Sequence, residues 1–212
     1  MQLTIPDRVV LFDYGEVISL SPSGADRAEL LALAGVPAEP FWRAYDAHRN
    51  ALDGGSLSSD EYWLRIAADC GVTWDSARRQ SLWNADMRGW LITDPTVVAV
   101  IEALAAGGTR LALLSNAAAE YGGLFRHSPM SRFFEQAFLS GELRLSKPDP
   151  AVFLHVCREL GIAPGALVFV DNRAENVRGA ESVGATGHVY AGPDGLVRFL
   201  TALAEPQPRS PE

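Results

Sequence analysis

Cysteine is scarce in this chain of 212 residues, which contains only Cys70 and Cys157. The two lie far apart and in no ligand-like spacing, so we expect a reducing compartment, with neither a disulfide framework nor a zinc site. No basic segment followed by an apolar run opens the chain, and no apolar run approaches the roughly 18 residues of a membrane span. These absences predict a cytoplasmic protein with no membrane partner.

Basic residues are also few, with 18 Lys and Arg against 26 Asp and Glu and a formal net charge of −8. A protein that binds nucleic acid or an anionic membrane needs a basic face, so this balance argues against both classes. A phosphorylated small molecule remains a plausible partner, because a few local cations or a metal ion can outweigh a distant net charge. No pattern in the sequence indicates an oligomeric state.

Short apolar runs that are typical of buried parallel strands recur along the chain. They cover residues 8–12, 109–114, 136–139, 166–170 and 186–190. Helical patterns lie between and after them at residues 95–106, 150–160, 174–183 and 196–204. This alternation predicts an α/β protein with a Rossmann-like parallel sheet and helices on both faces.

One long stretch, from about Ser21 to Arg88, breaks the alternation and contains no convincing strand. Its helical segments are expected at residues 25–34, 40–52, 59–69 and 76–87, each followed by a glycine turn. We therefore predict a core domain at residues 1–20 and 90–205, with a small all-helical cap at residues 21–89. The proline-rich end, residues 206–212, is expected to be a disordered tail.

Polar side chains follow several of the predicted strands, and one lysine lies in the loop before a predicted helix. They are Asp13, Ser115, Asn116, Lys147, Asp171 and Asn172. Ligands bind at the carboxyl edge of an open α/β sheet, although a single aspartate there can merely cap the next helix. As a set they suit phosphoryl transfer: one carboxylate as nucleophile, a second that needs a hard cation such as Mg²⁺ beside it, and a lysine for the phosphoryl oxygens.

Four motifs resemble those of the haloacid dehalogenase superfamily of hydrolases. They are F-D-Y-G-E-V-I at residues 12–18, L-L-S-N-A at 113–117, S-K-P-D-P-A-V-F at 146–153 and F-V-D-N-R-A-E-N-V at 169–177. They occur in the family's order, and the helical stretch lies where the family places its C1-type cap. The resemblance implies a hydrolase, with a Mg²⁺-dependent phosphatase of small phosphorylated metabolites as the expected activity.

Carried over residue by residue, the resemblance implies that Asp13 is the nucleophile. Asp13, the backbone carbonyl of Gly15 and Asp171 would hold Mg²⁺. Ser115, the amide of Asn116 and Lys147 would bind the phosphoryl group.

The chain departs from the family pattern at two positions. Gly15 stands where family phosphatases usually carry a second aspartate as general acid and base, a role typically worth about 10²–10⁴-fold. The pattern F-D-x-G-x-V resembles the branch that includes bacterial α-D-glucose-1-phosphate phosphatase, which implies an activated leaving group such as a sugar 1-phosphate. Glu16 is either a replacement proton donor or a surface glutamate. Asn172 replaces another frequent aspartate and would weaken the neutralisation of a metal ion.

Several further residues leave alternatives open. His48 or Arg49 either selects the leaving group or lies on a solvated helix face, the latter being favoured. Glu175 either orients the metal shell or places a charge near a helix N-terminus, and Asn176 could hydrogen-bond loop backbone near the site. The five tryptophans, at positions 42, 63, 74, 83 and 90, are expected mostly in the core.

Two other functions compete with the phosphatase. A 2-haloacid dehalogenase also uses a carboxylate nucleophile, but it needs no metal, and the paired acids Asp13 and Asp171 speak against it. A non-catalytic binding or regulatory protein could keep the scaffold without turnover. The intact nucleophile, lysine and metal aspartate argue against that reading.

Overall fold

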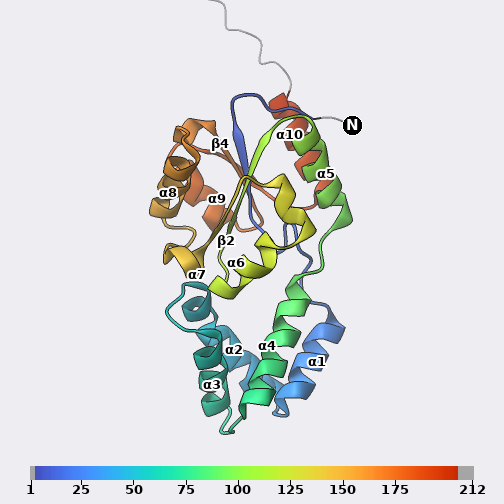
Figure 1. Cartoon of the computed structure of the whole chain (residues 1–212), viewed down its shortest axis with the longest axis vertical. Helices are drawn as coiled ribbons and strands as arrows, with labels where there is room; N and C mark the ends of the chain where they lie inside the picture. Colours follow the sequence, from blue (N-terminus) through green and yellow to red (C-terminus); the bar gives the residue numbers. More distant parts are fainter. Residues whose placement is uncertain (1–2, 205–212) are drawn as a thin grey trace, which may run out of the picture.

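A five-stranded parallel sheet forms the centre of the protein in a computed structural model that describes residues 3–204 (Figure 1). The strand order is β3-β2-β1-β4-β5. The strands are β1 (Val9–Phe12), β2 (Arg110–Ser115), β3 (Gln136–Leu139), β4 (Leu167–Asp171) and β5 (Thr186–Val189). All five predicted strands are present, and β1 lies between β2 and β4, which brings three polar strand ends together.

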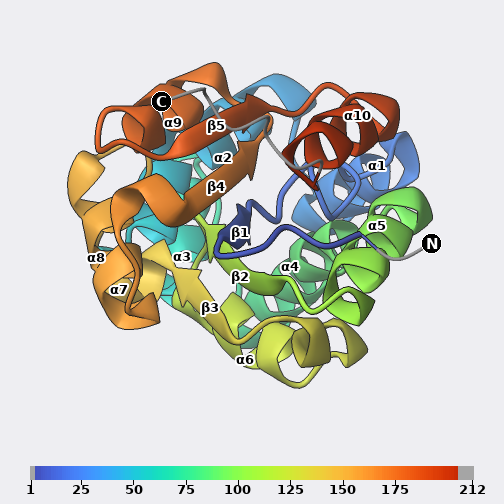
Figure 2. The ribbon, with the colours of Figure 1, turned by 90° about the horizontal axis from the view of Figure 1, so that it is seen from above.

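Helices cover both faces of the sheet (Figure 2). Successive side chains of a strand point to opposite faces, so each buried strand contributes apolar side chains to the helices on both sides. Val10 and Phe12 of β1 pack with α5 (Pro95–Ala106) and α10 (Pro193–Ala204). Val9 and Leu11 pack on the other face with α8 (Pro150–Leu160) and α9 (Ala174–Glu181). The doubly covered parallel sheet confirms the predicted fold class.

Four helices form a separate layer beyond the carboxyl ends of the strands, here called the helical lobe (Figure 1). They are α1 (Gly24–Ala34), α2 (Ala38–Asp53), α3 (Ser59–Asp69) and α4 (Ser76–Trp90). Their apolar faces share one cluster that contains Phe41, Tyr62 and Trp63. The two chain segments that join lobe and sheet pair with each other, since Leu20 N donates to Ile92 O (2.7 Å) and Asp94 N to Ile18 O (2.9 Å).

Helix α4 continues through Gly89, where the sequence pattern predicted its end. The reason is tertiary: a Cβ at Gly89 would lie 3.2 Å from Pro22 Cβ, so this glycine allows the start of the lobe to pack closely on α4. The short helices α6 (Ala119–Arg126) and α7 (Ser140–Leu143) and the 3₁₀ turns η1 (Pro129–Phe133) and η2 (Pro164–Ala166) were not predicted. Too few residues lie in each to show a clear apolar period.

Two remaining points concern the chain as a whole. Within residues 3–204, none of the helices has the length and apolar character needed to cross a membrane. The predicted disordered tail, residues 206–212, lies outside the described part of the chain.

Candidate active site

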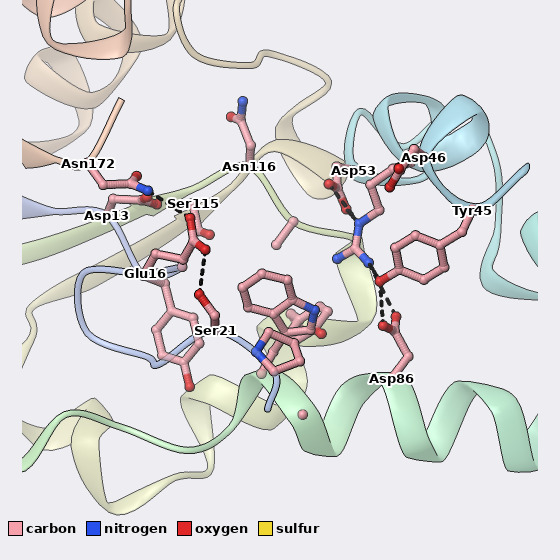
Figure 3. A pocket seen from close by; sticks show the side chains of 18 of the residues that line it. Asp13, Glu16, Ser21, Tyr45, Asp46, Asp53, Asp86, Ser115, Asn116 and Asn172 are labelled. Carbon is pink, nitrogen blue, oxygen red and sulfur yellow. Dashed lines mark hydrogen bonds and ion pairs between the residues drawn. The ribbon is translucent and has the colours of Figure 1, made fainter. Parts of the chain in front are cut away.

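A pocket of about 380 Å³ lies between the carboxyl edge of the sheet and the helical lobe (Figure 3). From the sheet side, its walls include Asp13, Gly15, Ser115, Asn116 and Lys147. Helices α1, α2 and α4 contribute the opposite wall. The pocket therefore brings together five of the six residues to which the sequence assigned a role.

Lys147 lies at the floor of this pocket and joins the two predicted carboxylates. Its Nζ is 2.7 Å from Asp13 Oδ1 and 2.7 Å from Asp171 Oδ2, and it donates to the Leu114 carbonyl at 3.0 Å. Lys147 and Asp13 are both buried, and Asp171 is fully buried. Asp171 is not part of the pocket wall, because Lys147 Nζ and its other partners enclose it.

The electrostatic balance at the floor leaves negative charge in excess. Burial raises the pKa of Asp13 from 3.8 to about 6, an effect that Lys147 opposes and the nearby Asp171 carboxylate adds to. One lysine thus does not neutralise two buried carboxylates. An oxygen-rich site with excess negative charge fits a hard divalent cation, and Gly15, whose carbonyl could be a further ligand, lines the same pocket. Residues 3–204 contain no cluster of three or more His, Cys, Asp or Glu side chains, so backbone or substrate oxygens would complete such a shell.

Asp171 is held in place by its neighbours. Asn176 Nδ2 donates to both carboxylate oxygens, at 3.1 and 3.0 Å, and the backbone N of Arg173 donates to Oδ1 at 2.7 Å. A bond from Asn176 to loop backbone was one open alternative, and its Nδ2 instead orients the Asp171 carboxylate. Glu175 is exposed, pairs with Arg173 and does not line the pocket, which favours its helix N-terminus interpretation.

The two residues that follow β2 differ in what their side chains do. Ser115 is buried and lines the pocket. The Asn116 side chain brackets the lysine loop, since its Nδ2 donates to Lys147 O at 2.8 Å and its Oδ1 accepts from Lys147 N at 2.9 Å. The side-chain amide of Asn116 therefore fixes the backbone that carries Lys147.

Glu16 turns into the pocket region and bridges two segments (Figure 3). Its carboxylate accepts from Ser21 Oγ at 2.5 Å and from Asn172 Nδ2 at 2.9 Å. Its φ of 58° is left-handed, a conformation that costs a residue with a side chain roughly 1 kcal/mol. The Asn172 side chain, which stands where the family often has a second aspartate, is thus hydrogen-bonded to Glu16.

The wall formed by the lobe carries a buried polar network that sequence reasoning missed. Arg49 Nε donates to Asp53 at 3.0 Å, and its Nη1 donates to Tyr45 Oη at 2.7 Å and to Asp86 Oδ2 at 3.3 Å. The Tyr45 hydroxyl donates to Asp86 Oδ1 at 2.6 Å. The favoured interpretation of Arg49 as a surface residue was wrong. His48 is bonded to Asp69 (2.8 Å) and does not line the pocket.

Only one pair of this network could have been predicted from residue spacing in the sequence. Arg49 and Asp53 are four residues apart on one helix, a spacing that favours an ion pair. Asp86 is reached from another helix, and no local signal connects it to Arg49. Of the tryptophans, Trp63 and Trp74 are buried in the lobe, whereas Trp42 and Trp90 line the pocket.

Comparison with known proteins identifies similar sequences. The sequence profile of the haloacid dehalogenase-like hydrolases matches residues 43–184. A phosphoglycolate phosphatase from Nitrosospira multiformis is 31% identical over 205 residues, which covers 92% of this chain and 87% of the relative. An (S)-2-haloacid dehalogenase from Pseudomonas sp. is 32% identical over 91 residues, and this match spans only 42% of the chain and 40% of that relative.

Comparison of structures agrees at the level of the fold. A magnesium complex of a HAD family enzyme from Bacteroides thetaiotaomicron superimposes with a TM-score of 0.70 and 19% identity. The match covers 86% of this chain and 92% of the other.

Proposed function

Because the chain belongs to the haloacid dehalogenase-like hydrolase family, we propose that it is a phosphatase that cleaves small phosphorylated metabolites with Asp13 as nucleophile. The family expected from the four motifs is confirmed, and the chain is a hydrolase. The observation that carries the proposal is the buried floor of the pocket, where Lys147 Nζ bridges Asp13 and Asp171 at 2.7 Å each. Phosphatases among the relatives support it.

In the proposed reaction, an Asp13 carboxylate oxygen attacks phosphorus while the bond to the ester oxygen breaks. The leaving group departs with the bonding electron pair and takes its proton from solvent. Water then attacks the phosphorus of the aspartyl-phosphate, the bond to Asp13 breaks, and inorganic phosphate leaves. Asp13 and Lys147 are the proposed catalytic residues, and Ser115, Asn116 and Lys147 are proposed to bind the phosphoryl group.

Asp13, the Gly15 carbonyl and Asp171 are the proposed Mg²⁺ ligands. The ion would offset negative charge on the phosphoryl oxygens and on the two carboxylates when it is bound. Asn176 supports this assignment, because it holds Asp171 through both carboxylate oxygens. The helical lobe is proposed to act as a cap that limits access of water to the floor.

The absence of an acidic side chain at position 15 indicates which kind of leaving group the site would favour. A Cβ at Gly15 would meet Trp90 Cζ3 at 3.7 Å, so an indole ring borders the position where a family phosphatase usually carries its acid. A leaving group that departs with little protonation suits such a site, and an anomeric hydroxyl is more acidic than an ordinary alcohol. We therefore propose sugar 1-phosphates as preferred substrates. The narrower resemblance to α-D-glucose-1-phosphate phosphatase stays a prediction.

Hydrolysis of p-nitrophenyl phosphate, with and without Mg²⁺, tests the proposal, because nitrophenolate needs no general acid. We expect Mg²⁺-dependent turnover by the wild type and its loss in Asp13→Asn. The matched control is Asp194→Asn, an exposed aspartate of α10 that does not line the pocket. Absence of turnover in the wild type would reject the phosphatase. Halide release from a 2-haloacid without added metal would then favour the dehalogenase.

A further inference from the structure

Two polar side-chain atoms in the pocket lining, one from α4 and one from α6, lack well-formed hydrogen bonds to the residues that the structure describes. Within residues 3–204, the Tyr121 hydroxyl and Trp90 Nε1 are buried and have no hydrogen bond of good geometry, although Arg49 lies beside the first atom and Tyr45 beside the second. Tyr121 is only 6% exposed, and both residues line the pocket. A buried polar group without a partner destabilises the folded protein, so a bound molecule that forms hydrogen bonds to these two atoms would gain affinity from them.

The charge around these atoms is negative. Arg49 is the cation nearest to them along this wall: it lies near Tyr121, and its guanidinium carbon is 5.9 Å from the centre of the Trp90 ring. Two carboxylates, Asp53 and Asp86, already bond it. Arg49 therefore has no net positive charge left to offer an anion.

The other charged side chains of the pocket do not change this negative charge to a positive one. Six acidic and four basic side chains line it. Lys147 is shared between two carboxylates, and Arg173 pairs with Glu175. The fourth basic residue, Arg27, is exposed and lies over the Trp42 ring at 3.9 Å.

The hydrogen-bonding groups of this part of the pocket favour a hydroxyl group over an anionic group in the bound leaving group. A hydroxyl group can accept from the Trp90 N–H and donate to a carboxylate oxygen at the same time, whereas a second carboxylate or phosphate can only accept. An additional anion would face Asp53 and Asp86 in a partly buried site, where repulsion is weakly screened. The Trp90 ring also offers an apolar surface beside the floor of the pocket.

From these contacts we propose that Tyr121, Trp90, Arg49 and Asp86 form a subsite that accepts an uncharged, hydroxyl-bearing leaving group and rejects one with a second anionic charge. The inference rests on the proposed phosphatase function and specifies its substrate class. It also separates this chain from its phosphoglycolate phosphatase relative, since phosphoglycolate carries a carboxylate in its leaving group.

Matched substrate pairs test the inference. α-D-Glucose 1-phosphate and α-D-glucuronate 1-phosphate share the anomeric oxygen and differ by one hydroxymethyl or carboxylate group. Glycerol 3-phosphate and 3-phosphoglycerate differ in the same way. We expect the uncharged member of at least one pair to have a kcat/KM about tenfold or more above its partner, and 2-phosphoglycolate to be a poor substrate.

Variants assign that preference to the subsite. Asp86→Asn removes one negative charge from the subsite, and Asp53→Asn serves the same purpose if the first variant does not fold. We expect either change to lower the kcat/KM ratio of uncharged to anionic substrate several-fold. Trp90→Phe and Tyr121→Phe remove the unpartnered polar atoms and are expected to lower kcat/KM for the uncharged substrate several-fold. Trp83→Phe is the matched control, because Trp83 Nε1 is also unpartnered within residues 3–204 but does not line the pocket. It should leave kcat/KM unchanged.

The outcomes separate the inference from the function on which it rests. The subsite is overturned, and the phosphatase function retained, in two cases in which p-nitrophenyl phosphate is hydrolysed. In the first, the anionic member of each pair has a kcat/KM equal to or above that of the uncharged member. In the second, neither pair is hydrolysed. A preference that Asp86→Asn and Asp53→Asn do not narrow, or equal losses in the Trp90 and Trp83 variants, also overturns it. No turnover of p-nitrophenyl phosphate rejects the phosphatase and the subsite together.

Discussion

Replacing Asp13 by asparagine should make the metal-free protein more stable. The Asp13 side chain is nine-tenths buried and shares Lys147 Nζ with Asp171. The amide oxygen of an asparagine can still accept from Lys147, so the change removes one buried charge and keeps the shape. One lysine would then face one carboxylate, which is a balanced pair.

The size of the effect follows from the pKa of Asp13, which burial raises from 3.8 to about 6. Because the folded state binds this proton more tightly than the unfolded state, the wild type loses stability as the pH rises from about 4 through 6. At pH 7.5 the full penalty is about 3 kcal/mol, and at pH 5 it is about half of that. For a chain of this size, 3 kcal/mol corresponds to a rise in Tm of about 6–12 °C.

Urea unfolding in EDTA at pH 5 and pH 7.5 measures this difference. Asp46→Asn is the control, because it removes an exposed charge from the same pocket and should change stability by no more than about 0.5 kcal/mol. If Asp13→Asn is no more stable than the wild type at pH 7.5, the unbalanced charge at the floor is refuted. A gain that is equally large at pH 5 would refute the link to Asp13 titration.

Three further substitutions probe other contacts. Lys147→Met leaves two buried carboxylates without their cation and should lower the free energy of unfolding by about 3–5 kcal/mol in urea. Asn176→Ala frees the carboxylate that it orients, and calorimetric titration should show Mg²⁺ binding weakened about tenfold or more. Gly55→Ala should lower the free energy of unfolding by more than roughly 2 kcal/mol in thermal unfolding, because its Cβ would lie 2.4 Å from the Gly141 carbonyl oxygen. Gly71→Ala is also at positive φ but has open space around it, so it should lower that free energy by only about 1 kcal/mol.

Each of these has a result that would contradict it. A Lys147→Met protein as stable as the wild type would mean that the carboxylates take up protons at little cost. Unchanged Mg²⁺ affinity in Asn176→Ala would separate Asp171 from the metal. Equal costs for the two glycine variants would show that the close approach between the turn after α2 and α7 is relaxed easily.

The sequence by itself determined the five strands, the longer helices with their succession along the chain, and most of the residues at the pocket floor. Buried parallel strands are continuously apolar, so β1 and β4 stand out, and the polar residue at each strand end marks the carboxyl edge. Asp13 and Ser115 could be assigned to one site because parallel strands end at the same edge of a sheet, whereas Lys147, in the loop before α8, was added from its chemistry and from the order of the motifs. The course of α4 through Gly89 could not be predicted, since it depends on the contact with Pro22.

Only the tertiary structure decided what surrounds the floor. Arg49 meets Asp86 across two helices, and Tyr121 reaches the same pocket from α6, a helix without a clear sequence signal. Side-chain pairs of this kind depend on how whole helices pack, and helical periodicity gives a face but not its neighbour. For the same reason, the direction of Glu16 toward Asn172 became visible only in three dimensions.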